Sequence, residues 1–277
     1  MQLKLTFQLS GKEQILPLNY QYPVSAWIYK VLEKADKGFS EKLHEEGYKL
    51  ENGKTFKLFT FSRINFPKNT WKIISNTGKM KIWARKAYLT ISFQLPAQLE
   101  KFVAGLFTYQ NVFIGDKDSG LKMKVQNIEM LQNNYFDAEV KDNKPVMLRV
   151  KSLTGIVLGL DVPEKKHEQY MNPLHEKYKE LFLKNLTDKC NAAGIKNIDT
   201  EKLDFKILNL SPKTVMQTIK SGTSSETKVR AYNYEFELTA PKKVIEVGMN
   251  AGFGSMNSLG FGFCGVKNEN KIKNLNK

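Results

Sequence analysis

The sequence predicts an α+β fold built from two units, each with the element order β-α-β-β-α-β. Three observations support this prediction. Short segments alternate polar and apolar residues, helical segments separate them, and the same order returns in the second half. The chain has 277 residues, enough for two modest domains that each bury a core. We place these domains at residues 1–135 and 136–277.

The first unit begins with a strand and a helix. Residues 2–9 alternate polar and apolar side chains, which is typical of a half-buried strand. Pro17 and Pro23 predict a loop after that strand. Residues 24–36 then repeat apolar side chains at helical spacing, and Tyr29 lies off the centre of the apolar stripe. The Tyr29 hydroxyl is therefore expected at the edge of the helix, within reach of solvent or a ligand.

A short second helix and a strand follow. Residues 40–46 are predicted as a helix that Ser40 could cap, and His44 lies on the flank of this helix. The alternation over residues 55–62 predicts one continuous strand. In that strand Lys57 lies on the face opposite its neighbouring apolar side chains, as a solvated lysine would.

The remaining segments complete both units. In the first we predict a hairpin over 71–75 and 79–83, a strand over 87–94, a helix from Pro96, and strands near 110–115 and 121–131. In the second we predict β-structure over 146–159, a helix over 173–190, strands over 203–210, 213–220 and 228–240, a short helix from Pro241, and a last strand over 261–267. This order is that of the ferredoxin-like fold, which RNA-recognition modules use among others.

The charge of the chain indicates a polyanionic partner. Lys and Arg number 43 against 28 Asp and Glu, a formal net charge of +15, and nucleic acid is the commonest polyanion that such a protein meets. Basic and aromatic residues stand at every second position over Lys228, Arg230, Tyr232 and Tyr234, so these side chains could line an RNA-facing strand. The other interpretation is a strand with one face in the core and the other in solvent.

Several function classes are disfavoured by what the sequence contains. No apolar run approaches twenty residues, so we expect no segment that spans a membrane. The two cysteines, Cys190 and Cys264, form no metal-ligand pair, and a reducing cytoplasm is the expected compartment. His167 and His175 are expected to be solvated or to cap a helix rather than to bind a metal. The sequence thus predicts neither a metal nor a cofactor.

A glycine-rich stretch lies near the end of the chain. The residues of interest in it are Gly252, Gly254, Ser255, Asn257, Ser258 and Gly260. Glycine allows a backbone to approach a ligand closely, so the stretch could hold an RNA phosphate through its N–H groups. The alternative is a tight turn that joins a helix to a strand. The glycines alone do not decide between these two interpretations.

Motifs at both ends of the chain resemble one family. They are Gly252-x-Gly254, Ser258 and Gly260-Phe261-Gly262 near the end, and Ile28-Tyr29-Lys30, Leu43-His44-Glu45 and Lys57-Leu58-Phe59-Thr60-Phe61-Ser62 in the first half. Together these motifs resemble the CRISPR-associated endoribonucleases of the RAMP superfamily, which cut repeat RNA into guide units. The resemblance implies two tandem ferredoxin-like domains and CRISPR repeat RNA as the partner.

The resemblance also implies a chemistry and the residues that perform it. It implies cleavage without a metal: a ribose 2′-OH attacks the adjacent phosphate, leaving a 2′,3′-cyclic phosphate and a 5′-hydroxyl. By motif, the catalytic residues implied are Tyr29, His44 and Lys57. An insert between His44 and Lys57 makes Lys54 an alternative to Lys57. The six residues of the glycine-rich stretch, with Lys228 and Arg230, are the candidates for RNA binding.

A second hypothesis fits the same sequence features. The protein could bind CRISPR repeat RNA without cutting it, as a structural subunit of a Cas effector complex. A third hypothesis is a general tandem RNA-recognition protein, although the sequence carries no convincing RNP motif. The sequence leaves both a monomer and a homodimer open.

Overall fold

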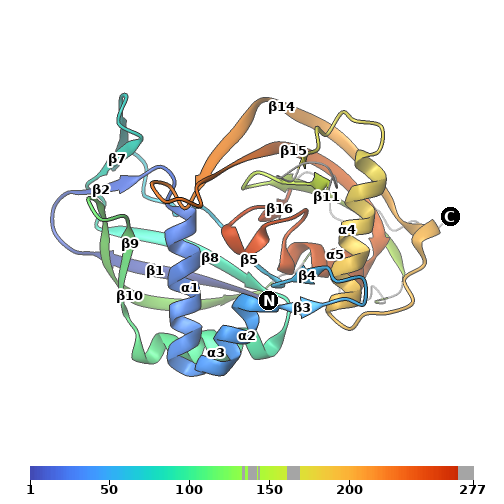
Figure 1. Cartoon of the computed structure of the whole chain (residues 1–277), viewed down its shortest axis with the longest axis horizontal. Helices are drawn as coiled ribbons and strands as arrows, with labels where there is room; N and C mark the ends of the chain where they lie inside the picture. The colour runs from blue at the N-terminus through green and yellow to red at the C-terminus, as the bar shows by residue number, and fades with distance from the viewer. Residues whose placement is uncertain (133–134, 137–141, 143, 161–168, 268–277) are drawn as a thin grey trace.

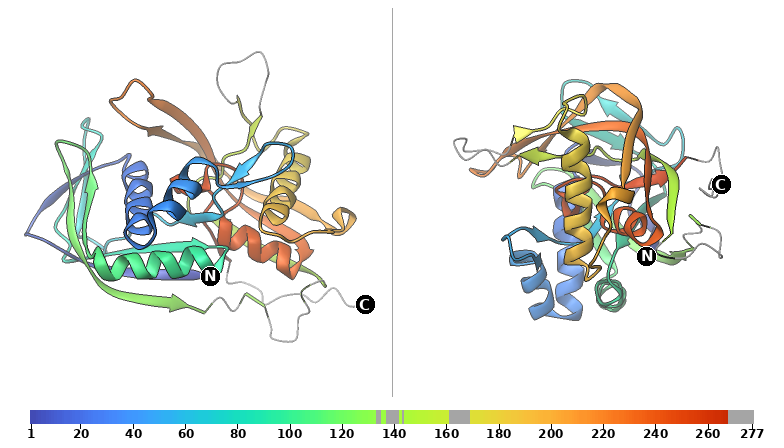
Figure 2. Two further views of the ribbon diagram at one scale, coloured as in Figure 1. Left: turned by 60° about the horizontal axis from the view of Figure 1, so that its bottom comes forward. Right: turned by 90° about the vertical axis from the view of Figure 1, so that its right-hand side faces the viewer.

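The structure, a computed structural model, describes residues 1–132, 135–136, 142, 144–160 and 169–267. Figure 1 shows two lobes, each made of a curved antiparallel sheet with helices beside it. The first lobe holds the blue and green part of the chain, and the second holds the yellow and red part (Figure 2). The fold is therefore mixed α/β, as the sequence predicts. No helix in these ranges is both long and apolar enough to cross a membrane.

The first lobe is built on an eight-stranded sheet. Its strands, from one edge, are β5 (Phe59–Phe61), β8 (Lys86–Phe93), β1 (Gln2–Leu9), β10 (Gly120–Leu131), β2 (Gln14–Pro17), β7 (Lys79–Ile82) and β6 (Trp71–Ile74), and β9 (Asn111–Gly115) also pairs with β10. The helices of this lobe are α1 (Gln21–Ala35), α2 (Lys37–Glu45) and α3 (Pro96–Thr108). Trp27 of α1 meets Phe7 of β1 and Phe102 of α3 edge to face, each with ring centroids 5.8 Å apart. This contact fixes α1 against both the sheet and α3.

The second lobe has a four-stranded sheet. Its order is β14 (Asp204–Ile219), β15 (Thr227–Pro241), β11 (Pro145–Ser152) and β16 (Cys264–Val266). The helices are α4 (Tyr178–Ala192) and α5 (Lys242–Ala251), with short strands β12 (Gly159–Leu160) and β13 (Gln169–Tyr170) and single turns η1 (Thr200–Lys202) and η2 (Asn257–Leu259). Phe182 of α4 contacts both Phe236 of β15 and Phe253 of the glycine-rich stretch, at ring-centroid distances of 5.4 and 5.7 Å. That stretch is thus part of the second core.

Most of the predicted elements are confirmed, but several boundaries were wrong. Helix α1 begins at Gln21 and not at residue 24, so Pro23, expected in a loop, lies in its first turn. Residues 14–17 form β2 against β7, where a loop was expected. Helix α2 begins at Lys37 and not at Ser40, because the Asp36 carboxylate caps it by accepting the Phe39 N–H at 2.9 Å. Helix α4 begins at Tyr178, five residues later than predicted.

Two strand predictions were also wrong. Residues 203–210 and 213–220 form the single strand β14, which stays paired with β15 through two register shifts. The predicted strand over residues 55–62 is interrupted. Its residues belong to β4 (Thr55–Phe56) and β5, and Leu58 between them has a φ of 54°. The interruption arises because Leu58 packs into the core of the second lobe, whereas Phe59 packs into that of the first.

The two lobes also touch through polar contacts. The amino group of Met1 donates to the Asn250 side-chain oxygen at 2.7 Å, and Ser92 donates to the Met249 carbonyl at 3.4 Å. A hairpin of β3 (Tyr48–Lys49) and β4 reaches from α2 across to α4 (Figure 1). The lobes therefore share a boundary that includes β5, α5 and this hairpin.

Candidate active site

The corner between α1 and α2 brings two of the predicted catalytic residues together. The rings of Tyr29 and His44 meet edge to face, with centroids 4.8 Å apart and an interplanar angle of 86°. Tyr29 also meets the edge of Phe59 at 5.6 Å, and the Ser40 hydroxyl donates to the Tyr29 carbonyl at 3.0 Å. Tyr29 is half-buried and His44 is exposed. A half-buried tyrosine ring and an exposed imidazole thus lie in contact where α1 meets α2.

Lys57 completes the set from the interrupted strand. Its Nζ donates to the carbonyl oxygen of His44 at 2.6 Å. Gly47 leaves space for the lysine stem, because a Cβ there would lie 3.2 Å from Lys57 Nζ and 2.7 Å from the Phe56 carbonyl oxygen. Gln98 of α3 fixes the backbone by donating to the Lys57 carbonyl at 2.7 Å. The three residues that the motifs singled out therefore form one cluster.

Burial sets the protonation of two members of this cluster. Desolvation raises the pKa of Tyr29 well above its usual range, and a hydrogen bond with the Ser258 side chain opposes this only in part. Tyr29 is therefore a hydroxyl donor at neutral pH. Desolvation also lowers the pKa of Lys57, against the raising effect of Glu45 and Glu46. The ammonium of Lys57 is thus held in a partly dehydrated position, where it interacts strongly with an anion.

Lys54, the alternative to Lys57, points elsewhere. Its Nζ forms an ion pair with the Asp188 carboxylate of α4 at 2.9 Å. The structure places Lys57, and not Lys54, against His44. Lys54 instead ties the β3–β4 hairpin to the second lobe.

The glycine-rich stretch is a packed loop. Gly252, Gly254, Asn257 and Gly260 are buried, whereas Ser255 and Ser258 are half-buried. Backbone N–H groups of the loop are used within the protein. Those of Ser255 and Gly260 donate to the carbonyls of Val157 and Asn257, at 2.6 and 2.9 Å. These N–H groups are therefore not free to cradle a phosphate in this conformation.

The loop joins the second lobe to the cluster of Tyr29, His44 and Lys57. The Asn257 side chain donates to the carbonyls of Phe253 and Phe261, both at 3.0 Å, and so closes the loop on itself. Thr60 of β5 donates to the same Phe261 carbonyl at 3.0 Å. This packing brings η2, which contains Ser258, beside α1, the helix that carries Tyr29. Sequence patterns gave no sign of this contact.

Lys228 and Arg230 lie on a different surface. Both are exposed on β15, whereas Tyr232 and Tyr234, on the same side of the strand, are buried, so this side faces solvent at the Lys228 end and the core farther along. Arg230 pairs in register with Met216 of β14. Met216 in turn lines a cleft between the lobes, so Arg230 lies next to the rim of that cleft.

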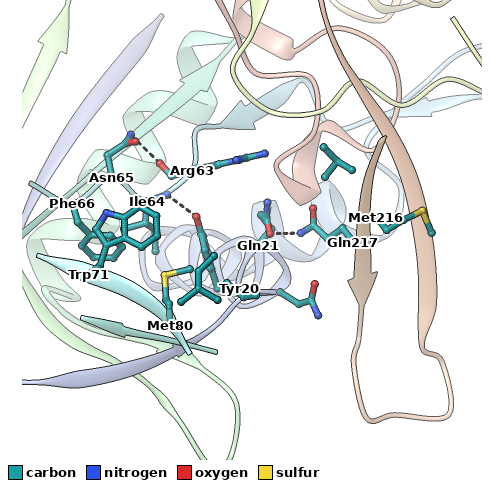
Figure 3. A pocket seen from close by; sticks show the side chains of 14 residues that line it. Tyr20, Gln21, Arg63, Ile64, Asn65, Phe66, Trp71, Met80, Met216 and Gln217 are labelled. Atoms are coloured by element: carbon teal, nitrogen blue, oxygen red, sulfur yellow. Dashed lines mark hydrogen bonds between the residues drawn. The ribbon is translucent and has the colours of Figure 1, made fainter. Parts of the chain in front are cut away.

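The cleft has a volume of about 510 Å³ and takes residues from both lobes. Figure 3 shows Phe66 and Trp71 on one side and Met216 on the other, with Arg63 at the rim. The Gln217 side chain donates to that of Gln21 and bridges the two sides. Trp71 is 44% exposed, so an aromatic face is open to a ligand. The sequence prediction missed this cleft, because its walls come from segments far apart in the chain.

The remaining histidines lie apart from the cluster in sequence. His167 is outside the described residues. His175 is exposed, and its Nδ1 accepts the Lys177 N–H at 3.2 Å. Within the described part of the chain, no group of three or more His, Cys, Asp or Glu side chains could hold a metal ion.

Comparisons with known proteins agree over most of the chain. The family described as CRISPR associated protein Cas6, C-terminal, matches residues 138–266, and the family described as CRISPR-associated protein Cas6, N-terminal, matches residues 15–125. A Methanocaldococcus jannaschii protein named CRISPR-associated endoribonuclease Cas6 1 is 26% identical over 266 residues, 95% of this chain and 91% of the relative. A Pyrococcus furiosus protein named CRISPR-associated endoribonuclease Cas6 is 24% identical over 93% of this chain and 86% of the relative.

Solved structures share the fold. One, described as an RAMP protein binding different RNA substrates, has a TM-score of 0.75 at 19% identity and covers 96% of this chain and 99% of its own. Another, from a Cas6-related gene of Pyrococcus furiosus, has a TM-score of 0.74 at 22% identity and covers 98% and 99%. The two family matches span residues 15–125 and 138–266, so nearly the whole described chain is assigned consistently. The chain belongs to the Cas6 family of CRISPR-associated proteins.

Proposed function

We propose that the protein is an endoribonuclease that cuts CRISPR repeat RNA into guide RNAs without a metal ion. The observation that carries this proposal is the cluster of Tyr29, His44 and Lys57, which supplies a hydroxyl, an imidazole and an ammonium at one surface. The names of the curated relatives, both CRISPR-associated endoribonucleases, support the same activity.

The proposed step is an internal transesterification. His44 accepts the proton of the ribose 2′-OH as this oxygen attacks the adjacent phosphorus. The bond from phosphorus to the 5′-oxygen breaks, and that oxygen takes a proton from solvent at the exposed face of the site. Lys57 stabilises the negative charge that builds on the phosphoryl oxygens, and Tyr29 orients the reacting group as a hydrogen-bond donor. The products are a 2′,3′-cyclic phosphate and a 5′-hydroxyl.

We infer that the RNA also contacts the cleft between the lobes. Single-stranded bases stack on exposed aromatic side chains, and Trp71 offers such a face in the cleft that Arg63 also lines. Lys228 and Arg230 neutralise phosphates beside this cleft. Of the glycine loop, we propose Ser255 as a direct contact and Ser258 as the residue that faces Tyr29, whereas the buried Gly252, Gly254, Asn257 and Gly260 shape the loop that carries them.

We further infer that the lobes are two ferredoxin-like domains, residues 1–135 and 136–277. The strand orders β5-β8-β1-β10 and β14-β15-β11-β16 support this, since each runs second, third, first and fourth in chain order. In each lobe one helix follows the first of these strands and another follows the third. The catalytic cluster then belongs to the first domain and the glycine loop to the second.

Cleavage in the presence of EDTA tests the proposed function. The protein, incubated with the repeat RNA of its own CRISPR array and excess EDTA, is expected to cut each repeat once. The upstream fragment should carry a 2′,3′-cyclic phosphate. A repeat with a single 2′-deoxy nucleotide at the cut position should bind and stay intact, since it lacks the nucleophile. Repeat RNA that is bound tightly but left whole would instead support the noncatalytic alternative.

Replacing Lys57 distinguishes the effect of its charge on cleavage from the effect of its size. Lys57→Met keeps the stem against Gly47 but removes the ammonium, so the cleavage rate of bound RNA is expected to fall about 10- to 50-fold. Because the pKa of Lys57 is lowered, the wild-type rate should decline as alkaline pH deprotonates the ammonium. Lys57→Arg should keep part of the rate and lose this decline, since guanidinium stays protonated. A wild-type rate in Lys57→Met would remove this residue from the mechanism.

A further inference from the structure

A lysine of the second lobe is buried at the glycine loop. Lys189 lies on α4, and only 2% of its surface is exposed. Its Nζ donates to the carbonyl oxygens of Gly252, at 2.5 Å, and of Gly254. Lysine is rarely buried unless it has a partner, because its charged form loses hydration. Burial accordingly lowers the pKa of Lys189 to about 7.

The carbonyls of Gly252 and Gly254 belong to the first part of the glycine-rich loop, and this loop continues to Ser258 near the active site. Phe253 lies between them, and its own carbonyl accepts from the Asn257 side chain. Asn257 begins η2, whose next residue is Ser258, and η2 packs against α1, the helix that carries Tyr29. A continuous set of hydrogen bonds and short backbone segments therefore links Lys189 to the catalytic cluster.

The glycine-rich loop needs contacts from outside the loop to hold one conformation, because the backbone of its glycines has wide conformational freedom. Gly252 and Gly254 have φ angles of 88° and 71°, which glycine adopts at no steric cost and leaves as easily. Without the two hydrogen bonds from Lys189, these carbonyls would be buried with fewer partners. Loss of the lysine would then favour other loop conformations.

The residue beside Lys189 supports the opposite side of the site. Asp188 pairs with Lys54, which lies three residues before Lys57. One position of α4 thus holds the hairpin that leads to Lys57, and the next holds the loop that leads to Tyr29. The C-terminal part of α4 contacts both segments that converge on the cluster.

We propose that Lys189 is a positioning residue for the cleavage reaction, which holds the glycine loop so that Ser258 orients the Tyr29 hydroxyl beside His44. The catalytic part of this inference rests on the proposed endoribonuclease function. Lys189 itself touches neither RNA nor the reacting atoms in this arrangement. Its effect passes through the loop, so it should change the rate of the chemical step and leave RNA affinity unchanged.

Four single variants and one double variant test this inference by single-turnover cleavage and by RNA binding. Lys189→Met and Ser258→Ala are each expected to slow cleavage of bound repeat RNA about 10-fold, with the dissociation constant changed less than about 2-fold. Because both act through one path, Lys189→Met with Ser258→Ala should be no slower than the slower single variant. Ser258→Thr, which keeps the hydroxyl, should restore the rate. Lys184→Met, an exposed lysine of the same helix, is the matched control and should behave as wild type.

Hydrogen exchange of the backbone amides gives a readout that does not depend on cleavage. In Lys189→Met the amides of residues 252–262 should exchange faster than in wild type, whereas in Lys184→Met they should not.

If wild type does not cut RNA, the proposed function fails. The exchange result still decides whether Lys189 holds the glycine loop in place. Wild-type exchange and wild-type rate in Lys189→Met would overturn the inference. So would rate losses that add in the double variant, or a loss of RNA affinity equal to the loss of rate. If Lys189→Met does not fold, the pair Ser258→Ala and Ser258→Thr decides it, and equal rates in those two would overturn it.

Discussion

Replacing His44 with alanine is expected to slow cleavage of repeat RNA by at least about 10²-fold. The imidazole is the exposed member of the cluster, in edge-to-face contact with Tyr29, and imidazole is the side chain best suited to carry a proton near neutral pH. The measurement is the single-turnover rate at saturating protein, so that a change in RNA affinity cannot mimic a change in chemistry. The contact of Lys57 with His44 goes to the backbone carbonyl, so the alanine variant should keep it.

The control for this prediction is His175→Ala. His175 is also an exposed histidine, and it belongs to the second lobe, where its ring nitrogen accepts only a local backbone N–H. Its replacement should leave the rate and the RNA dissociation constant unchanged. His44→Ala should bind RNA as wild type does, because one ring adds little to the RNA affinity of a chain with a net charge of +15. Full activity in His44→Ala would show that another group carries the proton.

Local patterns predicted the elements that carry the cluster but not how the elements meet. The apolar spacing around Tyr29 and the segment around His44 both indicated helices, and both helices are present. That their rings touch depends on the angle between α1 and α2, which the Asp36 cap and the Ser40 hydrogen bond help to set. Periodicity holds no information about such an angle, so only the family resemblance grouped these residues.

The position of Lys57 shows where a correct local rule gave a wrong element. Alternation over residues 55–62 favours one strand. The Leu58 side chain, however, packs in the core of the second lobe, and its backbone takes a left-handed conformation. That conformation costs about 1–2 kcal/mol for a residue with a Cβ, which burial of a leucine side chain offsets. No glycine or asparagine at this position signals the break, so the break could not be read from the sequence.

The burial of Lys189, by contrast, could be anticipated from the sequence. It follows Phe182 by seven residues and Leu186 by three, so helical spacing places it on the apolar stripe of α4. A lysine on such a stripe predicts either a snorkelling side chain or a buried partner. Its partners are the backbone carbonyls of Gly252 and Gly254, which lie far along the chain. A sequence does not show which backbone carbonyls lack another hydrogen-bond donor in the fold.

Gly262→Ala is expected to destabilise the protein far more than a change at another glycine with the same backbone angle. Gly262 has a φ of 70°, and Gly222, in the turn between β14 and β15, has a φ of 74°. At Gly222 an added Cβ meets nothing within 4 Å, so Gly222→Ala measures the cost of the left-handed conformation alone, about 1–2 kcal/mol. At Gly262 a Cβ would overlap the Phe253 carbonyl oxygen and lie 2.6 Å from Asn257 Nδ2.

The overlap at Gly262 cannot be relieved by a rotamer change, because it involves the backbone of the same loop. The Phe253 N–H donates to the Gly262 carbonyl at 3.0 Å, so the two backbone segments of the loop are already at hydrogen-bonding distance and have no space for a Cβ between them. We expect Gly262→Ala to cost about 4 kcal/mol or more in the free energy of unfolding, measured by denaturant titration beside Gly222→Ala. If the two variants lose equal stability, the loop is able to open without penalty, and its support of Tyr29 through Ser258 would be too weak to matter. If Gly262→Ala folds but cuts RNA slowly, the loop acts on the chemistry from the second lobe. The glycines of the family motif would then be explained by close packing against the catalytic cluster, and not by direct contact with a phosphate.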